Sequence, residues 1–542
     1  MPLEGRVQAD VLVVGSGASA VNAASPLVAG GLRVRMLDFG NRDEVYESLV
    51  PAAPFSTIRR TDPNQHRYFL GDRYEGLALG RVSIGAQLTP PRQHVPRDTP
   101  ALTPVISRTF FPLESLALGG LAAAWGAGCP PFIDADLAGF PITHADLAAH
   151  YEAVAERIGI SGARDDLLPF FGDLHAMQPA VANDTNARAI LDRYRRRQSL
   201  LNRTGFYLGQ PRLAVLSQDH RGRAANQYRD MDFWSDHGKS VYRPRWTVEE
   251  LLRHTNFEYC AGLLVERFHE SGNDVVEVLA HDMQTGARER HEARALVLAA
   301  GTLGTTRIVL RSLGGYGVRV PLVCNPHTYA PMLNLHMLGT VADDRRHSLA
   351  QLCFAYAPAP DASATLGHLY SYRSLLGFKL LKESPLPYRE GLRIFRLLLP
   401  SFVIVLMQHA DAPGDGKYCV LRPDGEGRAG ALEIEYALSA EEEERIERTE
   451  RAIVRCFRKL GCICVRRVRP GHAASAHYAG TLPMTTAQRE LTTEPNGRLR
   501  GTRAVYVADG AVFPRLPSKG LTFTMMANAD RVGTHLRQRL GS

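Results

Sequence analysis

An unbroken apolar run, a glycine turn and a second apolar run follow one another near the N-terminus. Residues 11–14 read Val-Leu-Val-Val, a β-branched run typical of a strand buried on both faces of a parallel sheet. Residues 18–29 are expected to form a helix, and residues 32–37 a second strand. The pattern predicts a strand–helix–strand unit, as expected at the start of an α/β fold.

The turn between the first strand and the helix has the form G-x-G-x-x-A. Gly15 permits a tight turn, Gly17 lets the backbone approach a pyrophosphate, and Ala20 keeps helix and strand close. The helix directs its positive N-terminal end at the phosphates. Asp38 ends the second strand about twenty residues further on, where a carboxylate can accept hydrogen bonds from ribose hydroxyls. The segment predicts a site for an adenine dinucleotide.

Helical periodicity returns in the middle and the last third of the chain. Apolar spacing predicts helices over residues 146–158 and 183–197. Ser439 and Glu442 form a capping box that opens a later helix, and Gly461 ends it. Residues 41–112 and 200–240 show no sustained period, so loops are expected there.

Residues 317–469 alternate in short strands and are interpreted as a separate sheet domain. Within them, residues 403–408 and 418–422 are expected to pair. The apolar tract 397–407 is interrupted by Pro400 and Ser401 and is too short to span a bilayer. It is expected to be a buried strand, with an edge lying on a membrane as the alternative. No transmembrane segment is predicted, and peripheral membrane contact stays open.

Length and composition describe an ordinary globular protein. A chain of 542 residues exceeds one compact core, so two domains or one elaborated domain are expected. Apolar residues make up 45% and charged residues 22%, both usual values. No basic region followed by an apolar one opens the chain, so a cytoplasmic location is expected.

Charge and cysteine spacing narrow the possible partners. The formal net charge of +8 comes with arginine-rich stretches at 193–197 and 466–469, which can attract anionic substrates, acidic partners or membrane surfaces. Apart from Tyr194, no aromatic residue lies among these charges, so a solvated basic face is expected rather than a nucleic-acid partner. The eight cysteines match no zinc or iron–sulfur spacing, so reduced thiols and no metal site are expected.

Two further small-residue segments can face the same ligand. Residues 118–131 surround Trp125 with Gly and Ala, which suits backbone packed on a flat ligand or, alternatively, a tight helix–helix contact. Near the C-terminus a strand at 505–508 ends in Asp509 and Gly510, and Thr522 opens the last helix. This arrangement can bring both ends of the chain onto one cofactor.

In this order, the motifs resemble those of the glucose–methanol–choline (GMC) flavoprotein oxidoreductases, bacterial type, along essentially the whole chain. The resemblance rests on Gly15-x-Gly17, Gly119-Gly120, Trp125-Gly126, residues 140–147, Ala299-Ala300-Gly301, His477-x-x-Gly480-Thr481, Ala508-Asp509-Gly510, Phe513-Pro514 and Thr522-x-Thr524.

The resemblance implies an α/β, Rossmann-like FAD-binding domain assembled from noncontiguous segments. It also implies an α+β substrate domain with a mainly antiparallel sheet, the architecture of GMC and PHBH-like flavoproteins. The FAD domain would comprise residues 1–165, 241–316 and 477–542. Residues 166–240 would be a cap or insertion, and residues 317–476 the substrate domain.

The resemblance also implies where FAD contacts the chain. Asp38 would hold the adenosine ribose, Val265 the adenine through its backbone, and Trp125 the flavin ring. Asp509 would contact the ribityl–pyrophosphate region, and Thr522 would lie at the pyrimidine edge, where a helix N-terminus stabilises negative charge on the reduced flavin. The full set of expected cofactor-binding residues is Gly15, Gly17, Ser19, Ala20, Asp38, Gly119, Gly120, Trp125, Gly126, Val265, Ala300, Gly301, Asp509, Gly510, Ala511 and Thr522.

His477 matches the family's catalytic histidine. Hydride removal from an alcohol carbon requires loss of the hydroxyl proton, which a histidine can accept; the alternative is a structural histidine that caps the Gly480 turn. Most family members carry a second histidine or asparagine where this chain has Gly520. The neighbouring Lys519 would substitute, or one of three histidines of the substrate domain. These are His327, His336 and His409.

The leading interpretation is an FAD-dependent alcohol or sugar dehydrogenase or oxidase. Hydride would pass from a CH–OH carbon to flavin N5 with His477 as base, and electrons would leave to oxygen, a quinone or another acceptor. A small sugar-like or natural-product alcohol is the expected substrate. Relatives that link FAD covalently carry a histidine where this chain has Ala124, so noncovalent FAD is expected. The alternative is a flavin-containing lyase or decarboxylase of the same family.

Overall fold

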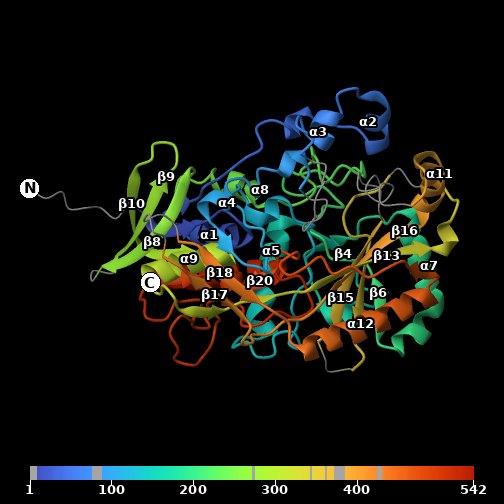
Figure 1. The fold of residues 1–542 in the computed structure, drawn as a ribbon. Helices are drawn as coiled ribbons and strands as arrows, with labels where there is room; N and C mark the ends of the chain where they lie inside the picture. The colour runs from blue at the N-terminus through green and yellow to red at the C-terminus, as the bar shows by residue number, and fades with distance from the viewer. Residues whose placement is uncertain are drawn as a thin grey trace, which may run out of the picture.

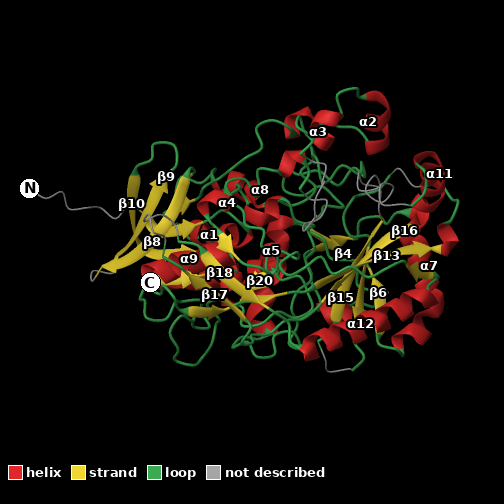
Figure 2. Cartoon of the chain, viewed as in Figure 1, coloured by secondary structure: helices red, strands yellow, loops and turns green. Residues whose placement is uncertain are grey.

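Two large sheets stand at opposite ends of the molecule, with loops and short helices between and above them (Figures 1 and 2). The computed structural model describes residues 9–75, 88–271, 275–341, 345–359, 363–371, 385–423 and 430–541. The N-terminal strand and the C-terminal helix lie in the same half of the molecule (Figure 1).

The first sheet has seven strands and contains the N-terminal strand at its centre. Its order is β7 (Phe257–Cys260), β2 (Val34–Leu37), β1 (Ala9–Val14), β10 (Arg288–Leu298), β9 (Val275–Asp282) and β8 (Leu263–Ser271), with β21 (Val505–Val507) also on β10. The strands β7, β2, β1, β10 and β21 run parallel, and the hairpin partners β8 and β9 run antiparallel. The predicted strands at both ends of the chain thus share one sheet. The first half of the long strand β10 pairs with β9.

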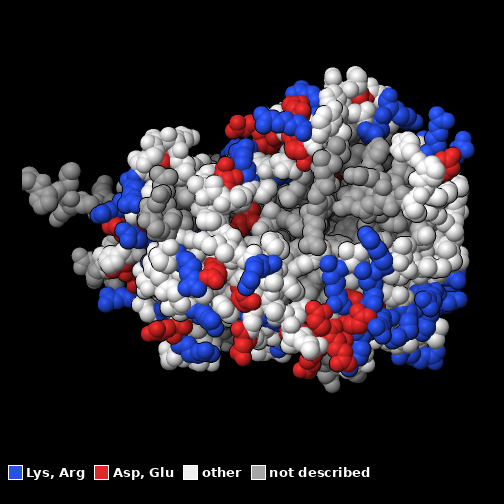
Figure 3. Space-filling model, viewed as in Figure 1, with Lys and Arg blue, Asp and Glu red and all other residues white. Residues whose placement is uncertain are grey.

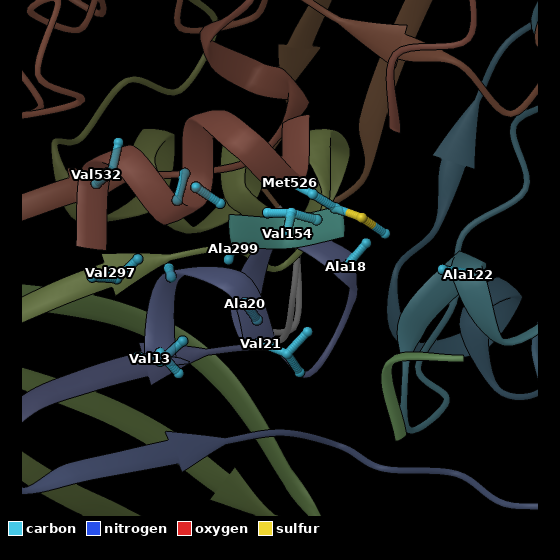
Figure 4. Close-up of a cluster of buried hydrophobic side chains, with 14 of the residues drawn as sticks. Val13, Ala18, Ala20, Val21, Ala122, Val154, Val297, Ala299, Met526 and Val532 are labelled. Atoms are coloured by element: carbon cyan, nitrogen blue, oxygen red, sulfur yellow. The ribbon is translucent and has the colours of Figure 1, made fainter. Parts of the chain in front are cut away.

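Helices from the two ends of the chain cover this sheet together. α1 (Ala18–Ala29), α13 (Thr522–Gly541) and α5 (His144–Ile158) pack on one another. Figure 4 shows their apolar side chains, among them Val21, Val154 and Met526, in one cluster with Val13 and Val297 of the strands. On other sides, α9 (Thr302–Ser312) packs against β8 and α8 (Pro244–Leu251) against α1. The C-terminal helix is therefore part of the N-terminal core.

The second sheet has six strands, and every neighbouring pair is antiparallel. Its order is β19 (Cys462–Cys464), β13 (His327–Asn334), β16 (Phe402–Gln408), β15 (Thr365–Ser371), β14 (Leu352–Tyr356) and β6 (Phe206–Gly209). α7 (Thr185–Asn202) and α12 (Ala440–Lys459) pack on one face of it, where Met332 and Val405 join a core with Ile190 and Phe457. Successive side chains of a strand point to opposite faces of the sheet, so the residues between these core positions point to the face that α7 and α12 do not cover.

The outer side of α12 carries the charges that the sequence places there. The capping box of Ser439 and Glu442 is present, as predicted. Arg469 contacts Glu450 at 2.9 Å and Glu447 at 3.1 Å, so carboxylates of the helix pair with the basic stretch 466–469. Figure 3 shows acidic side chains gathered in a red cluster over α12, bordered by blue ones.

Three smaller sheets complete the strand inventory of the described residues. β11 (Arg319–Pro321), β17 (Lys417–Leu421), β18 (Leu432–Tyr436) and β3 (Val105–Ile106) form one of them. β12 (Val323–Cys324) pairs with β20 (Tyr478–Ala479), and β4 (Ile160–Gly162) pairs with β5 (Met177–Pro179). Residues 317–469 therefore contribute strands to both the six-stranded and the four-stranded sheet, instead of forming one sheet.

Two expectations on secondary structure are corrected. Residues 403–408 and 418–422 do not pair, because β16 lies between β13 and β15 while β17 lies between β11 and β18. The tract 397–407 is not one strand. It contains the end of α11 (Tyr388–Leu398) and a 3₁₀ turn at Leu399–Ser401, and Phe402 begins the strand, since Pro400 cannot donate to a ladder.

The stretches expected to be loops also contain short elements. Residues 41–112 include α2 (Phe55–Thr61), α3 (His66–Leu70) and α4 (Thr99–Leu102), which are too short to show a sustained period. The predicted insertion contains α6 (Leu168–Phe171), α7 and the edge strand β6, so part of it joins the second sheet. The domain boundaries themselves stay predictions. Among the described residues, no helix combines the length and the apolar character needed to cross a bilayer.

Candidate functional site

A cavity of about 1320 Å³ runs from the carboxyl ends of β1 and β2 to the helix-free face of the second sheet. Its walls come from the turn after β1, the end of β2, residues 113–130, β8, the turn after β10, and residues 474–478 and 520–525. Ligands of open α/β sheets bind at the carboxyl ends of the strands, so the first of these walls is a dinucleotide site by position.

The turn after β1 brings two backbones unusually close together. Gly15 has φ +98°, and a Cβ there would stand 2.6 Å from the carbonyl oxygen of Ala299. Gly120 has φ +59°, and its Cβ would stand 3.2 Å from the Cα of Gly17. Only residues without a side chain fit these contacts. The glycines therefore form a backbone cradle at the start of α1.

One polar atom in this cradle is without a partner. Ser19 lies in the first turn of α1 and lines the cavity, and its Oγ is buried with no hydrogen bond within the described structure. A buried, unsatisfied hydroxyl beside free helix N–H groups fits an anionic ligand group. The cradle thus fits the pyrophosphate of a dinucleotide.

Asp38 is held at the end of β2 by two hydroxyl groups. Ser16 Oγ donates to its carboxylate at 2.5 Å and Tyr259 Oη at 2.9 Å, while Ser16 Oγ accepts from the backbone N–H of Gly119 at 3.0 Å. Burial raises the pKa of Asp38 to about 6, and the two hydroxyls oppose that rise. The carboxylate lines the cavity with acceptor capacity left for a ribose.

The segment around Trp125 forms the wall between the two ends of the cavity. Trp125 Nε1 donates to the carbonyl of Tyr242 at 2.8 Å, which fixes the indole ring. A Cβ at Gly126 would meet no atom within 4 Å, so the glycine borders open space. Ala124, Trp125 and Gly126 all line the cavity, which favours the interpretation of a flat ligand over that of a helix–helix contact.

The turn after β10, at Ala299-Ala300-Gly301, and the C-terminal motif around Asp509 form another wall of the cavity. Asp509 accepts from Thr305 Oγ1 at 2.5 Å and from the N–H of Ala511 at 3.0 Å. Burial raises the pKa of this carboxyl to about 6. Ala300 and Gly301 line the cavity beside it, as do Val265 of β8 and Thr522 at the start of α13.

Four expected cofactor-binding residues lie behind the described cavity wall. A Cβ at Gly510 would stand 2.7 Å from Thr302 Oγ1, so this glycine permits helix packing. Ala20 and Ala511 are fully buried, and the N–H of Gly119 is bonded to Ser16. Their side chains or backbone support the wall without forming it.

His477 stands at the other end of the cavity, between the two sheets. It directly precedes β20, its ring is half-buried, and its Nδ1 is buried without a partner in the described structure. Burial, and secondarily the nearby His368, lowers the pKa of His477 to about 4. The imidazole is therefore neutral near pH 7 and can accept a proton.

Gly520 lies against His477, but Lys519 does not reach it. A Cβ at position 520 would stand 3.6 Å from Cε1 of His477. The Lys519 ammonium pairs with buried Asp136 and donates to the carbonyl of Phe170 at 2.6 Å, and Lys519 is not among the described residues that line the cavity. Its proposed catalytic role is corrected, because its charge is satisfied by structural partners.

The three alternative histidines are separated by the fold. His327 begins β13 and lines the cavity, with its ring centroid 5.4 Å from that of His477 and the ring planes at 90°. His409 lies with its Nε2 3.7 Å from Glu450, and His336 packs beside Gly461; neither belongs to the described cavity wall. Of these three histidines, only His327 lines the cavity beside His477.

The helix-free face of the second sheet contributes side chains of which the sequence analysis named only His327. Alternate residues of three strands face the cavity: His327, Tyr329 and Pro331 of β13; Ile404, Leu406 and Gln408 of β16; His368 and Tyr370 of β15. Period-two alternation within each strand was the available signal, but the strand order that places these rows side by side was not readable.

Comparisons with known proteins agree with this geometry. Residues 433–529 match the family model described as GMC oxidoreductase. The chain is 25% identical to 6'''-hydroxyparomomycin C oxidase of Streptomyces lividus, over 98% of this chain and 92% of that protein. It is 23% identical to paromamine 6'-oxidase of Streptomyces fradiae, over 96% and 90%.

Solved structures of low sequence identity share the fold. Pyridoxine 4-oxidase from Mesorbium loti superposes with a TM-score of 0.58 at 14% identity, covering 97% of this chain and 99% of that one. A variant of formate oxidase from Aspergillus oryzae RIB40, described for its effect on FAD modification, gives a TM-score of 0.60 at 10% identity, covering 98% of both. The predicted combination of an α/β nucleotide-binding sheet and an antiparallel second sheet is confirmed.

Proposed function

Because this chain belongs to the GMC oxidoreductases, a family of FAD-binding flavoproteins, we propose that it oxidises a CH–OH group of a sugar-like small molecule. One observation carries the proposal. A single cavity joins the glycine cradle and Asp38 to the neutral imidazole of His477. A dinucleotide in the cradle and an alcohol at His477 would therefore share one enclosed space.

FAD would be held by groups along the nucleotide half of the cavity. The cradle of Gly15, Gly17 and Ser19 would bind the pyrophosphate, and Asp38 the ribose. Trp125 and Gly126 would border the flavin ring, with Asp509 and Thr522 on the other wall. When bound, FAD supplies the electron acceptor, taking the alcohol's C–H hydrogen with its electron pair. Ala124 offers no group for a covalent link, so we propose noncovalent binding.

The FAD-binding domain would comprise residues 1–165, 241–316 and 477–542. The strands that form the seven-stranded sheet fall in these three segments. The helices that bury its centre, α1, α5 and α13, also come from them. Residues 317–476 would then supply most of the substrate half of the cavity.

His477 would remove the hydroxyl proton of the alcohol. Its pKa of about 4 keeps the ring unprotonated at neutral pH, and the half-buried ring is open to the cavity. As the C–H bond breaks and the carbonyl forms, the hydroxyl proton moves to the imidazole, so charge balances at the substrate. The two relatives are named as oxidases of paromamine-type compounds, and we propose an aminoglycoside-like or related natural-product alcohol for this chain.

The substrate half of the cavity suits a hydroxyl-rich molecule. Tyr329, Tyr370 and Gln408 offer neutral hydrogen-bonding groups, and Oε1 of Gln408 is buried without a partner in the described structure. The carboxylate of Asp230 is already paired with Arg346 at 3.1 Å. Uncharged donors and acceptors recognise hydroxyl groups, and a neutral substrate bound to them buries no unpaired charge.

The test is the visible spectrum of the FAD-loaded protein under anaerobic conditions, with sugars, aminosugars and aminoglycosides added in turn. We expect one class to bleach the flavin band near about 450 nm. His477→Asn should slow bleaching about 10²- to 10⁴-fold with unchanged FAD content. The wild-type rate should fall only as the pH drops through about 4, where His477 becomes protonated. If no alcohol bleaches the flavin, the proposed function is wrong.

Readmission of air then separates the acceptors. Rapid recovery of the oxidised spectrum identifies oxygen as acceptor, and slow recovery a quinone or another carrier. The lyase alternative rested on the missing side chain at position 520. Since His327 lies beside His477, no observation favours that alternative, and oxidation is the function we propose.

A further inference from the structure

His327 is a buried histidine for which the described structure provides no hydrogen-bond partner. It begins β13, is 7% exposed, and both ring nitrogens are buried and unpaired. An unpaired buried polar group is destabilising, and most such groups in native proteins have a partner. Strand alternation aims the ring into the cavity, in the same row as Gln408 of the neighbouring strand. The position indicates that a ligand completes its hydrogen bonds.

The surroundings keep this imidazole neutral. Burial, together with His477, His409 and His368 nearby, holds the pKa of His327 well below its ordinary value. A neutral imidazole has one donor and one acceptor nitrogen. It can therefore hold an alcohol oxygen in either hydrogen-bonding sense without carrying charge.

The space beside His477 is open on the side of position 520. The Cβ that Gly520 lacks would point to within 3.6 Å of Cε1 of His477, with Pro130 at 3.8 Å as the next contact. Position 520 itself supplies no side chain to this space. From the other side, the ring of His327 stands perpendicular to that of His477 at a centroid distance of 5.4 Å.

We propose that His327 is the second catalytic residue, and that it holds the oxidised hydroxyl of a neutral, hydroxyl-rich substrate against His477. The inference deepens the proposed function and rests on it. The second active-site group then comes from the antiparallel sheet rather than from the connection before α13. The substrate oxygen would bind both imidazoles, one from each side of the domain boundary.

The two histidines have different tasks in this arrangement. The hydroxyl proton moves to His477, the C–H hydrogen leaves with its electron pair to the bound cofactor, and the C–O bond becomes a carbonyl. His327 keeps its own proton and hydrogen-bonds the oxygen throughout. Its contribution is orientation of the O–H bond and stabilisation of the charge that develops on oxygen.

The first experiment replaces the imidazole and then rebuilds a polar group from the other side. His327→Leu should lower kcat about a hundredfold, the size of a lost positioned hydrogen bond in a transition state. Its melting temperature should stay unchanged or rise, because an unpaired buried polar group is replaced by an apolar one. Combining His327→Leu with Gly520→Asn should recover at least tenfold in kcat, as an amide then reaches the same space. His291→Asn, at a buried histidine of β10 outside the described cavity wall, is the matched control and should retain wild-type kcat.

A purely structural role for His327 predicts the opposite pattern. His327→Leu would then lower the melting temperature and FAD content together, and Gly520→Asn would rescue nothing. A kcat within twofold of wild type in His327→Leu would likewise overturn the proposal.

The second experiment needs no substrate, so it separates this inference from the proposed function. Protein labelled with ¹³C at histidine Cε1 and loaded with FAD is titrated by NMR, with and without His327→Leu. We expect the His477 signal to shift in the variant, because the ring at a centroid distance of 5.4 Å is lost, and the pKa of His477 to fall, because an apolar side chain replaces a polar one beside it. His291→Asn should leave that signal unchanged. An unmoved His477 signal in His327→Leu overturns the pairing, whether or not an alcohol is oxidised.

Discussion

At the scale of single residues, the site depends on buried polar groups whose partners are incomplete. Asp38 has two hydroxyl donors, Ser19 has none, and the His327 ring has none among the described residues. Such groups are costly in a folded protein unless a ligand satisfies them. Their clustering along one cavity is the residue-level argument for a bound cofactor and substrate.

Asp38 gives a prediction on the pH dependence of cofactor affinity. Its pKa is raised to about 6 by burial, and a ribose donates to the ionised form, so FAD should bind the carboxylate and displace a proton. FAD affinity should therefore be constant above pH 6 and weaken as the pH falls below about 6, by up to tenfold per pH unit.

Isothermal titration of the FAD-free protein at several pH values measures this dependence. Asp38→Asn should bind FAD more weakly and lose most of the slope. A remaining slope would report on Asp509, whose pKa is also raised to about 6. Equal slopes in wild type and Asp38→Asn would contradict the assignment.

At the scale of elements, the contact between α1 and α13 sets the position of the phosphate cradle. A Cβ at Gly533 would stand 2.2 Å from the carbonyl oxygen of Ala23 and 2.9 Å from Pro26. The two helices can approach this closely only because position 533 has no side chain. Since the N-terminus of α1 forms the cradle, its packing on α13 affects the cofactor site directly.

Gly533→Ala is therefore expected to destabilise the protein by about 1–3 kcal/mol, the usual cost of overpacking against backbone. FAD affinity should fall with it. Gly541→Ala on the same helix is the matched control, because a Cβ there meets no atom within 4 Å. Urea unfolding of both variants measures the difference, and equal stability of the two would show that α1 and α13 can separate at no cost.

At the scale of the whole molecule, the nucleotide half of the cavity is assembled from distant parts of the chain. Its walls come from residues 14–39, 113–130, 263–266 and 299–304, and from the C-terminal region around Asp509 and Thr522. On the face that Figure 3 shows, charged groups of both signs are spread over the surface. A ligand that touches all these segments must stabilise the complete fold.

FAD should therefore raise the stability of the whole protein in a single transition. At a free concentration a hundredfold above Kd, the stabilisation should be about 2.7 kcal/mol. Differential scanning calorimetry of the FAD-free and FAD-loaded protein measures it. A loaded protein in which only a minor transition moves would show that the segments do not fold as one unit.

The sequence was most informative where chemistry and local geometry coincide. The places of Gly15, Gly17 and Asp38 can be predicted from a strand, a turn, a helix and a second strand in succession, because they depend on neighbours along the chain. The helix caps at Ser439 and Glu442 were predictable for the same reason. The position of His477 beside a cavity followed from its motif, although its role is a proposal.

Local pattern was insufficient where pairing partners lie far apart. The strands at 403–408 and 418–422 looked like partners because they are neighbours in sequence, yet they belong to different sheets. Lys519 looked available because it adjoins Gly520, yet its ammonium is bound by Asp136 and Phe170. Neither arrangement can be predicted from the spacing of residues along the chain. The contacts of Lys519 are with segments more than 300 residues away, and the strand pairing depends on the order of strands in the sheets.

The sequence by itself thus indicated the glycine turn after β1, the α/β class and the resemblance to the GMC oxidoreductases, because each rests on contiguous motifs with fixed local geometry. The tertiary structure alone decided which side chains face the substrate. His327, His368 and Gln408 line the same cavity as His477 only because three antiparallel strands are aligned in register, while His477 directly precedes β20, which begins 151 residues after the start of β13. Side-chain direction in a strand has a period of two, so a change of register or order would have turned a different set of residues to the cavity.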